Sequence, residues 1–158
     1  MSQITCTRRL TFCAGHRVLG HENKCAHLHG HNYVVEVTAR SAATVDALGR
    51  VIDFSVIKAL LGNWLDTNFD HGFILHEQDA ANIEYLSNLV VQPGEGHPHL
   101  QLPSVRQKLF VLPINPTAEN IAHYLLHTVC PLLFGSSGVQ IIKVRVHETE
   151  NCYADAEL

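Results

Sequence analysis

The sequence predicts one α+β domain, in which helices cover one face of a four-stranded antiparallel sheet. Apolar and polar residues alternate over residues 4–14 and 139–148, as they do in strands with one buried face. Apolar residues recur with helical spacing over residues 53–66 and 115–129. The predicted order is strand, strand, helix, helix, strand, strand, and such separate blocks are typical of the α+β class.

The composition limits the kinds of function that the chain can have. Its 158 residues, 46% hydrophobic and 16% charged, are enough for one well-packed core. A net charge of −4 argues against a nucleic-acid surface. The sequence has neither the run of about 18 apolar residues that a membrane-spanning helix needs nor the apolar stretch of a secretory signal. Five cysteines without a regular spacing favour reduced thiols, so we expect a cytoplasmic protein without nucleic-acid or membrane partners.

The first two strands are expected to form a hairpin. In residues 4–14 the even positions are mainly apolar, but Arg8 interrupts them, so a bend or bulge is expected there. A second strand is predicted from His29, with Tyr33 and Val35 continuing its apolar face. The ten or so residues between the strands would form the connecting loop.

The two helices have recognisable starts. Asp53 or Ser55 is the predicted N-cap of the first helix. The second is expected to have Asn115 as its cap and Pro116 at its first helical position. The predicted buried stripes are Ile57, Leu60, Leu61, Trp64 and Leu65 in the first helix, and Ile121, Tyr124, Leu125 and Thr128 in the second.

The remaining segments give signals of unequal strength. Residues 72–112 predict only a short helix near 80–89 and a turn-rich loop after it. The strand over 139–148 places Ile142, Val144, Val146 and Glu148 on one face. A brief final strand is predicted over 151–154.

Three histidines lie where the two strands of the hairpin begin and end. His29 and His31 are two apart on a strand and point to the same face, and His16 has the matching position after the first strand. Three imidazoles with one open position are typical of a catalytic zinc site. The alternative is ordinary surface or core histidines, since His97 and His99 repeat the same spacing in a plain loop.

Cys25 lies four residues before His29, and its spacing leaves three interpretations open. It could be a fourth zinc ligand, which would close the site and make it structural. It could be an inert small apolar residue, which is common for a free cysteine. It could also be a catalytic base, with its thiolate form favoured by Lys24 and by a bound cation.

Two further polar features are candidates for chemistry. Asp70 and His71 form an adjacent carboxylate–imidazole pair after the first helix, although an Asp in a turn often bonds only its own backbone. Glu148 ends the apolar row of the strand over 139–148. It is either at the wet end of that strand or paired with a ligand.

These residues belong to longer motifs that resemble the 6-pyruvoyl tetrahydropterin synthase / 6-carboxytetrahydropterin synthase family. The motifs cover most of the chain in the order of the family, which scattered histidines would not reproduce. They are FCAGHRVLGHENKCAHLHGHNY, GRVIDFSVIK, FDH, NPTAENIA and VHETEN.

The resemblance implies the tunnelling fold, in which the sheets of several subunits join into a barrel with active sites between subunits. A homo-oligomer is expected, as a hexamer of two stacked trimers or a smaller assembly. It also implies roles for single residues: His16, His29 and His31 would hold Zn²⁺, Cys25, Asp70 and His71 would be catalytic, Glu148 would grip the pterin, and Thr117 and Glu119 would lie close to it.

The resemblance also implies a substrate. The short spacing Cys-x-x-x-His-Gly-His is similar to the 6-carboxytetrahydropterin synthase branch, which feeds 7-deazapurine and queuosine synthesis. The expected reaction converts 7,8-dihydroneopterin triphosphate, a pterin triphosphate, with loss of triphosphate and a two-carbon aldehyde. Lys24 and Arg17 are candidate triphosphate-binding cations. The alternatives are the pyruvoyl-forming enzyme and a non-catalytic zinc-binding scaffold.

Compared with compact members of this branch, the single domain of residues 1–158 carries an insertion at about 72–112. Such a segment could cap the sheet, modify subunit contacts or line the pocket.

Overall fold

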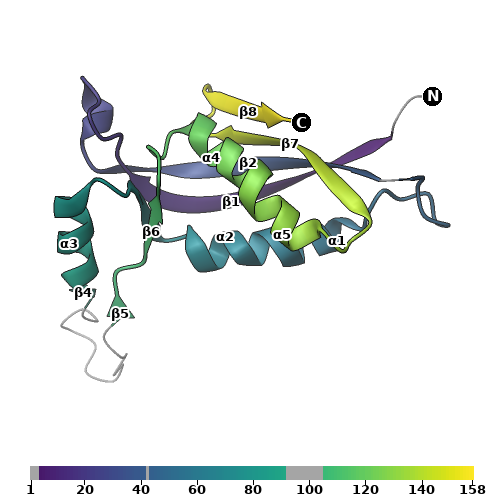
Figure 1. Cartoon of the computed structure of the whole chain (residues 1–158), viewed down its shortest axis with the longest axis horizontal. Coiled ribbons are helices and arrows are strands. Elements are labelled where there is room, and N and C mark those ends of the chain that lie inside the picture. Colours follow the sequence, from purple (N-terminus) through teal and green to yellow (C-terminus); the bar gives the residue numbers. More distant parts are fainter. Residues whose placement is uncertain (1–3, 42, 92–104) are drawn as a thin grey trace.

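The computed structural model describes residues 4–41, 43–91 and 105–158, and its main feature is a six-stranded mixed sheet (Figure 1). The α+β class is confirmed, whereas the predicted four-stranded, purely antiparallel sheet is wrong. The strand order is β6-β3-β1-β2-β7-β8. The strands are β1 (Thr5–His16), β2 (His29–Ser41), β3 (Gly72–His76), β6 (Leu109–Leu112), β7 (Val139–His147) and β8 (Tyr153–Glu157).

The predicted hairpin of β1 and β2 forms the centre of the sheet. The two strands pair antiparallel in unbroken register from Thr5 opposite Arg40 to His16 opposite His29. Because this register passes through Arg8 without a shift, the predicted bulge at that position is wrong. The alternation itself is confirmed, since Tyr33, Val35, Val37 and Ala39 are buried.

The irregularity of the sheet lies instead between β2 and β7. Thr38 pairs with Lys143 while the next residue, Ala39, pairs with Ile141, so Ile142 is the extra residue of a β-bulge. The bulge changes the parity of β7, and Ile141 rather than Ile142 is buried. Strict alternation through Ile142 was therefore a wrong expectation, although Val144 and Val146 are buried as predicted.

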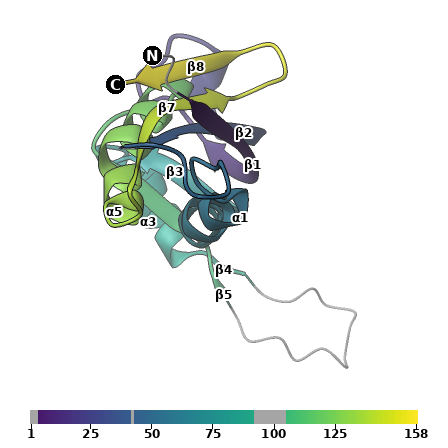
Figure 2. The same ribbon diagram turned by 90° about the vertical axis from the view of Figure 1, so that its right-hand side faces the viewer.

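The two strands that the sequence did not predict come from residues 72–112. β3 pairs parallel with β1, and β6 pairs parallel with β3. Between them lie α3 (Ala80–Asn88), close to its predicted position, and a short ladder of β4 (Val90–Val91) and β5 (Val105–Arg106). This ladder extends away from the main body of the chain (Figures 1 and 2). The predicted loop with His97 and His99 lies outside the described residues.

Each of the two long helices consists of three parts, with a π-helical turn in the middle. The first runs through α1 (Phe54–Ile57), η2 (Lys58–Gly62) and α2 (Asn63–Asn68), and the second through α4 (Ala118–Tyr124), η3 (Leu125–Val129) and α5 (Cys130–Phe134). Asp53 caps the first helix by accepting a hydrogen bond from the Ser55 amide. Thr117 caps the second, so the prediction of Asn115 as cap and Pro116 as first helical residue is wrong.

Both long helices pack on one face of the sheet and enclose the core with it (Figure 2). The other face carries the polar positions of the strands and is open in the single chain. Within the described ranges, every helix is too short or too polar to cross a membrane. The largest fully buried side chains are Tyr33, Phe69, Phe134, Ile57, Leu61, Leu65, Ile74, Leu75, Leu112, Ile121, Leu125 and Leu126.

Candidate active site

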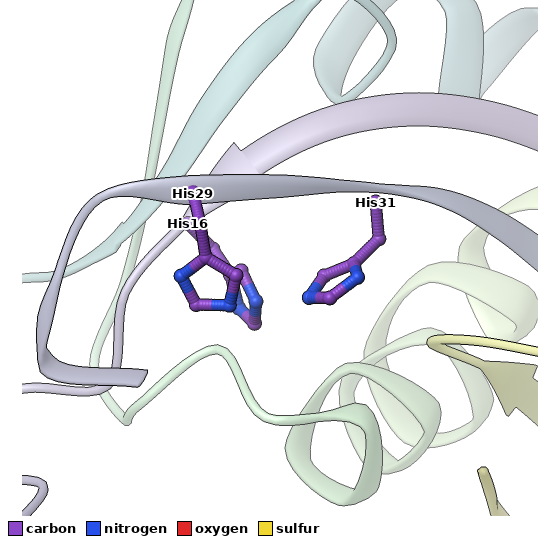
Figure 3. A group of neighbouring side chains, drawn as sticks. All are labelled: His16, His29 and His31. Carbon is purple, nitrogen blue, oxygen red and sulfur yellow. The ribbon is translucent and has the colours of Figure 1, made fainter. Parts of the chain in front are cut away.

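The three predicted metal ligands converge at one end of the β1–β2 hairpin (Figure 3). His16 ends β1 directly opposite His29, the first residue of β2, and His31 lies two residues further along the same face. The ring centroid of His16 lies 4.6 Å from that of His29 and 5.1 Å from that of His31. One nitrogen atom from each ring lies within 4.8 Å of the other two.

Hydrogen bonds to backbone carbonyls fix the tautomers of two of these imidazoles. Nδ1 of His16 lies 2.8 Å from the carbonyl oxygen of Pro116, and Nδ1 of His29 lies 2.7 Å from that of His27. A carbonyl oxygen only accepts hydrogen bonds, so each Nδ1 carries the proton and each Nε2 keeps a free lone pair. This is the arrangement in which a histidine serves as a metal ligand.

Burial keeps the centre of the cluster neutral. His16 is 1% exposed, and its pKa is lowered to about 4, mainly by this burial. The hydrogen bond to Pro116 acts in the opposite direction, whereas the two neighbouring imidazoles lower the pKa further. Burial also lowers the pKa of His31. Nε2 of His16 and Nε2 of His31 are buried and have no hydrogen-bond partner among the described residues. Three converging imidazoles, two of them with buried and unpartnered nitrogens, fit a zinc ion.

Glu148, Tyr33 and Cys25 lie beside this cluster. Oε1 of Glu148 is 3.4 Å from Nε2 of His31. The hydroxyl of Tyr33 is buried without a partner, and its pKa is raised by burial first and then by Glu148 and Cys25, which are both close enough to act on it. Tyr33 had been predicted only as part of the apolar face, because alternation alone does not reveal an unpartnered hydroxyl.

The thiol of Cys25 is not one of the ligand atoms that meet at the imidazoles. The described residues whose donor atoms gather there are the three histidines alone. Cys25 lies in the short 3-10 turn η1 (Lys24–Ala26), and its carbonyl oxygen accepts a hydrogen bond from the Val18 amide at 2.8 Å. This geometry favours a free thiol near the cluster over a fourth ligand.

The NPTAEN motif ties the second long helix to the hairpin loop. The Asn115 side chain accepts from the Leu19 amide at 2.8 Å and donates to the Leu19 carbonyl at 3.0 Å. The Thr117 hydroxyl accepts from the Asn120 amide, while Glu119 is exposed in the first turn of α4. The motif is therefore structural at Asn115 and at Thr117, and the pterin contacts of Thr117 and Glu119 stay predictions.

Asp70 and His71 form the expected carboxylate–imidazole pair at the turn before β3. Oδ2 of Asp70 accepts from Nδ1 of His71 at 2.6 Å, and its Oδ1 accepts from the Cys13 amide at 2.7 Å. Burial alone would raise the pKa of Asp70, but these two bonds and the nearby Lys108 outweigh it and lower the pKa. The ionised carboxylate thus orients the ring of His71 through Nδ1 and makes no bond to Nε2.

The backbone of this turn is held by Lys108, which the sequence did not single out. His71 has a φ of +56°, which is uncommon for a residue with a side chain. Nζ of Lys108 donates to the carbonyl oxygens of Asp66 at 2.7 Å and Asp70 at 2.6 Å. Lys108 comes from the segment 72–112, so this part of the predicted insertion supports the turn that carries His71.

His71 lies beside an open hollow of about 510 Å³ on the polar face of the sheet. Cys13, Asn32 and His31 also line this hollow. On β1 and β2, Cys13 and Asn32 have the opposite parity to the ligand histidines. Side chains of opposite parity point to opposite faces of a sheet. The hollow beside the exposed His71 therefore lies mainly on the face opposite to the three imidazoles, although His31 also lines it.

Comparison with known proteins places this site in a family. The model of the family described as 6-pyruvoyl tetrahydropterin synthase matches residues 5–158. The chain belongs to this family. Among curated relatives of this synthase domain, the 6-carboxy-5,6,7,8-tetrahydropterin synthase of Rickettsia bellii is 43% identical, over 96% of this chain and 99% of that protein. The protein of the same name from Rickettsia typhi is 41% identical with the same coverage, and the predicted family is confirmed.

Solved structures confirm the fold of this family member. An uncharacterized protein from Wolinella succinogenes superposes with a TM-score of 0.76 at 24% identity, over 99% of both chains. The 6-pyruvoyl tetrahydropterin synthase of Caenorhabditis elegans superposes with a TM-score of 0.63 at 22% identity, over 100% of this chain and 97% of that one. At these identities the likeness concerns the fold.

Proposed function

We propose that this chain is a zinc-dependent 6-carboxy-5,6,7,8-tetrahydropterin synthase. It would convert 7,8-dihydroneopterin triphosphate to 6-carboxytetrahydropterin, with release of acetaldehyde and triphosphate, in 7-deazapurine and queuosine synthesis. The observation that carries the proposal is the convergence of three imidazoles in a chain that is 43% identical to a protein of that name. Glu148 lies 3.4 Å from His31, and Cys25 is close enough to Tyr33, beside the imidazoles, to raise its pKa. The motifs of the family predict a pterin-binding and a catalytic group at these two residues.

His16, His29 and His31 would hold the zinc ion, which would supply a Lewis acid toward the hydroxyl groups of the substrate side chain. The carboxylate of Glu148 would accept hydrogen bonds from two adjacent N–H groups of the pterin ring. Cys25 would remove a proton from carbon on one side of the substrate, and Nε2 of His71 would move a proton on the other. Asp70 would orient His71 and stabilise its charged form.

His71 borders a hollow that lies mainly on the sheet face opposite to the imidazoles, and this position supports an active site shared between subunits. A complete set of groups around one substrate would then combine the three imidazoles and Cys25 of one subunit with His71 of a second copy. In the part of the chain that the structure describes, the edge strands β6 and β8 each have one neighbour in the main sheet, so both offer an edge for pairing with further copies. A homo-oligomer whose subunits join their sheets would pair these edge strands and could bring His71 of one copy to the imidazoles of another.

Product analysis separates the carboxy-forming reaction from the pyruvoyl-forming one. The short gap of three residues between Cys25 and His29 and the names of the curated relatives favour the carboxy product. Incubation of the zinc-loaded protein with 7,8-dihydroneopterin triphosphate should release acetaldehyde and triphosphate. A pterin product that keeps all three side-chain carbons would refute the proposal and support the rival reaction.

A single substitution separates an enzyme from a zinc-binding scaffold. If Cys25 is a catalytic thiol, Cys25→Ala should keep its zinc and its fold while it loses turnover. If Cys25 is a structural ligand, the same variant should lose both zinc affinity and stability. Zinc content, thermal unfolding and turnover are measured together, with Cys152→Ala, at an exposed thiol, as the matched control.

A further inference from the structure

A buried ion pair connects the segment 72–112 to the loop that carries Cys25. Asp79 precedes α3 and is 4% exposed, whereas Arg17 directly follows β1. The Nε and Nη2 atoms of Arg17 donate to the two carboxylate oxygens of Asp79 at 2.6 and 3.1 Å. Asn82 donates to the same carboxylate at 3.0 Å. The carboxylate is thus bound on both oxygens, as a buried charge requires.

Asp79 occupies the N-cap position of α3 but does not cap the helix. An aspartate at this position usually accepts a hydrogen bond from an amide of the first turn. Here the side chain makes no such bond, and both of its oxygens face Arg17 instead. The placement of this carboxylate is therefore explained by Arg17 rather than by helix stability.

The remaining nitrogen of the Arg17 guanidinium, Nη1, binds the backbone of Ala26, the residue after Cys25. This nitrogen donates to the carbonyl oxygen of Ala26 at 3.2 Å, while the amide of Val18 donates to the carbonyl oxygen of Cys25. A guanidinium is planar and holds its donors in a fixed fork. The orientation that Asp79 imposes on one side of the fork is therefore transmitted to the backbone beside Cys25.

These bonds speak against Arg17 as a triphosphate-binding cation. Its side chain is 24% exposed, and its donors are engaged with Asp79 and Ala26. Binding a phosphate would require breaking a bidentate pair with a buried carboxylate. The expectation that Arg17 binds triphosphate is therefore replaced by a positional role, and exposed Lys24 remains the candidate for phosphate.

We propose that Arg17 and Asp79 are positioning residues that hold the Cys25 thiol at its working place. The inference rests on the proposed catalytic role of Cys25, and neither positioning residue contacts the reacting atoms. Misplacing a catalytic group by about 1 Å costs on the order of 100-fold in rate. Asp79→Asn should therefore lower kcat by roughly 10- to 100-fold and leave KM within about threefold.

The chemical reactivity of the thiol provides a readout that does not depend on turnover. In the zinc-loaded oligomer, the rate of Cys25 alkylation by iodoacetamide is measured by peptide mass analysis. Asp79→Asn should change this rate by about tenfold, because the loop no longer holds the thiol in one orientation. The exposed thiols of Cys13 and Cys152 serve as references in the same sample, and their rates should stay within twofold.

Two further variants keep the test decisive. Asp46→Asn removes a carboxylate that pairs with Arg50 at an exposed site, and it should change neither readout. If Asp79→Asn does not fold, Arg17→Lys keeps a charge beside Asp79 but loses the planar fork, and it should give the same change in Cys25 alkylation.

The outcomes separate the two proposals. Folded Asp79→Asn or Arg17→Lys with unchanged Cys25 alkylation and unchanged kcat would overturn the positioning role. Full turnover in Cys25→Ala would overturn the catalytic role of the thiol itself. An altered alkylation rate together with an active Cys25→Ala variant would show that the loop is positioned as inferred but that the thiol does not catalyse.

Discussion

Acidification of the metal-free protein from pH 7 to pH 5 is expected to remove about 2 kcal/mol of stability through His16 alone. His16 is 1% exposed, and burial lowers its pKa to about 4 from its ordinary value of 6.5. Between these two values the unfolded chain binds a proton that the folded chain does not. The free energy of unfolding therefore falls as the pH falls through this window, by up to about 1.4 kcal/mol per pH unit.

The assay is urea unfolding of chelator-treated protein at several pH values. Protein concentration is held constant, because the stability of an oligomer depends on it. His16→Asn removes the titrating imidazole and should reduce the loss between pH 7 and pH 5 by about 2 kcal/mol, while the contribution of His31 remains. The control is Asn88→Ala, at an exposed residue of α3 without a titrating group, which should leave the loss unchanged. Equal losses in wild type and His16→Asn would refute the argument that His16 is held neutral by burial.

Three further substitutions test the supports of the site. Lys108→Met leaves two backbone carbonyls without their charged donor, so it should lower the unfolding free energy by roughly 2 kcal/mol and also lower the turnover that depends on His71. Urea unfolding and steady-state kinetics measure the two effects, and unchanged values of both would contradict this role of Lys108. Asn115→Ala removes both side-chain bonds to Leu19 and should cost about 2 kcal/mol, whereas Asn88→Ala on exposed α3 should cost less than about 0.5 kcal/mol in the same assay. Tyr33→Phe removes a buried hydroxyl without a partner and should stabilise the metal-free protein by about 1 kcal/mol in calorimetry, and a loss of stability would instead reveal a partner for that hydroxyl.

The local part of the site could be predicted from the sequence because it depends on strand alternation. The parity of two strands and one hairpin register were enough to bring His16, His29 and His31 together. The strands β3 and β6 were missed for the opposite reason. They are short, and β3 is buried at Gly72, Ile74 and Leu75, so a period of two is not visible in it.

Contacts between distant segments could not be predicted from spacing. The Arg17–Asp79 pair joins residues 62 positions apart, and Lys108 reaches the Asp70 turn from 38 positions away. The N-cap of the second helix was misplaced because Asn115 uses its side chain for Leu19 rather than for the helix. In each case a polar side chain has several possible partners, and the tertiary structure decides among them.

The bond from His16 to the Pro116 carbonyl joins the imidazole cluster to the start of a helix that lies 100 residues further along the chain. A displacement of the His16 ring would also disturb Asn115, whose side chain binds the backbone of Leu19 in the hairpin loop. Loading of the cation and ordering of the loop should for this reason occur together. Amides of the loop would then exchange with deuterated solvent more slowly once zinc is added, far beyond the atoms that touch the ion.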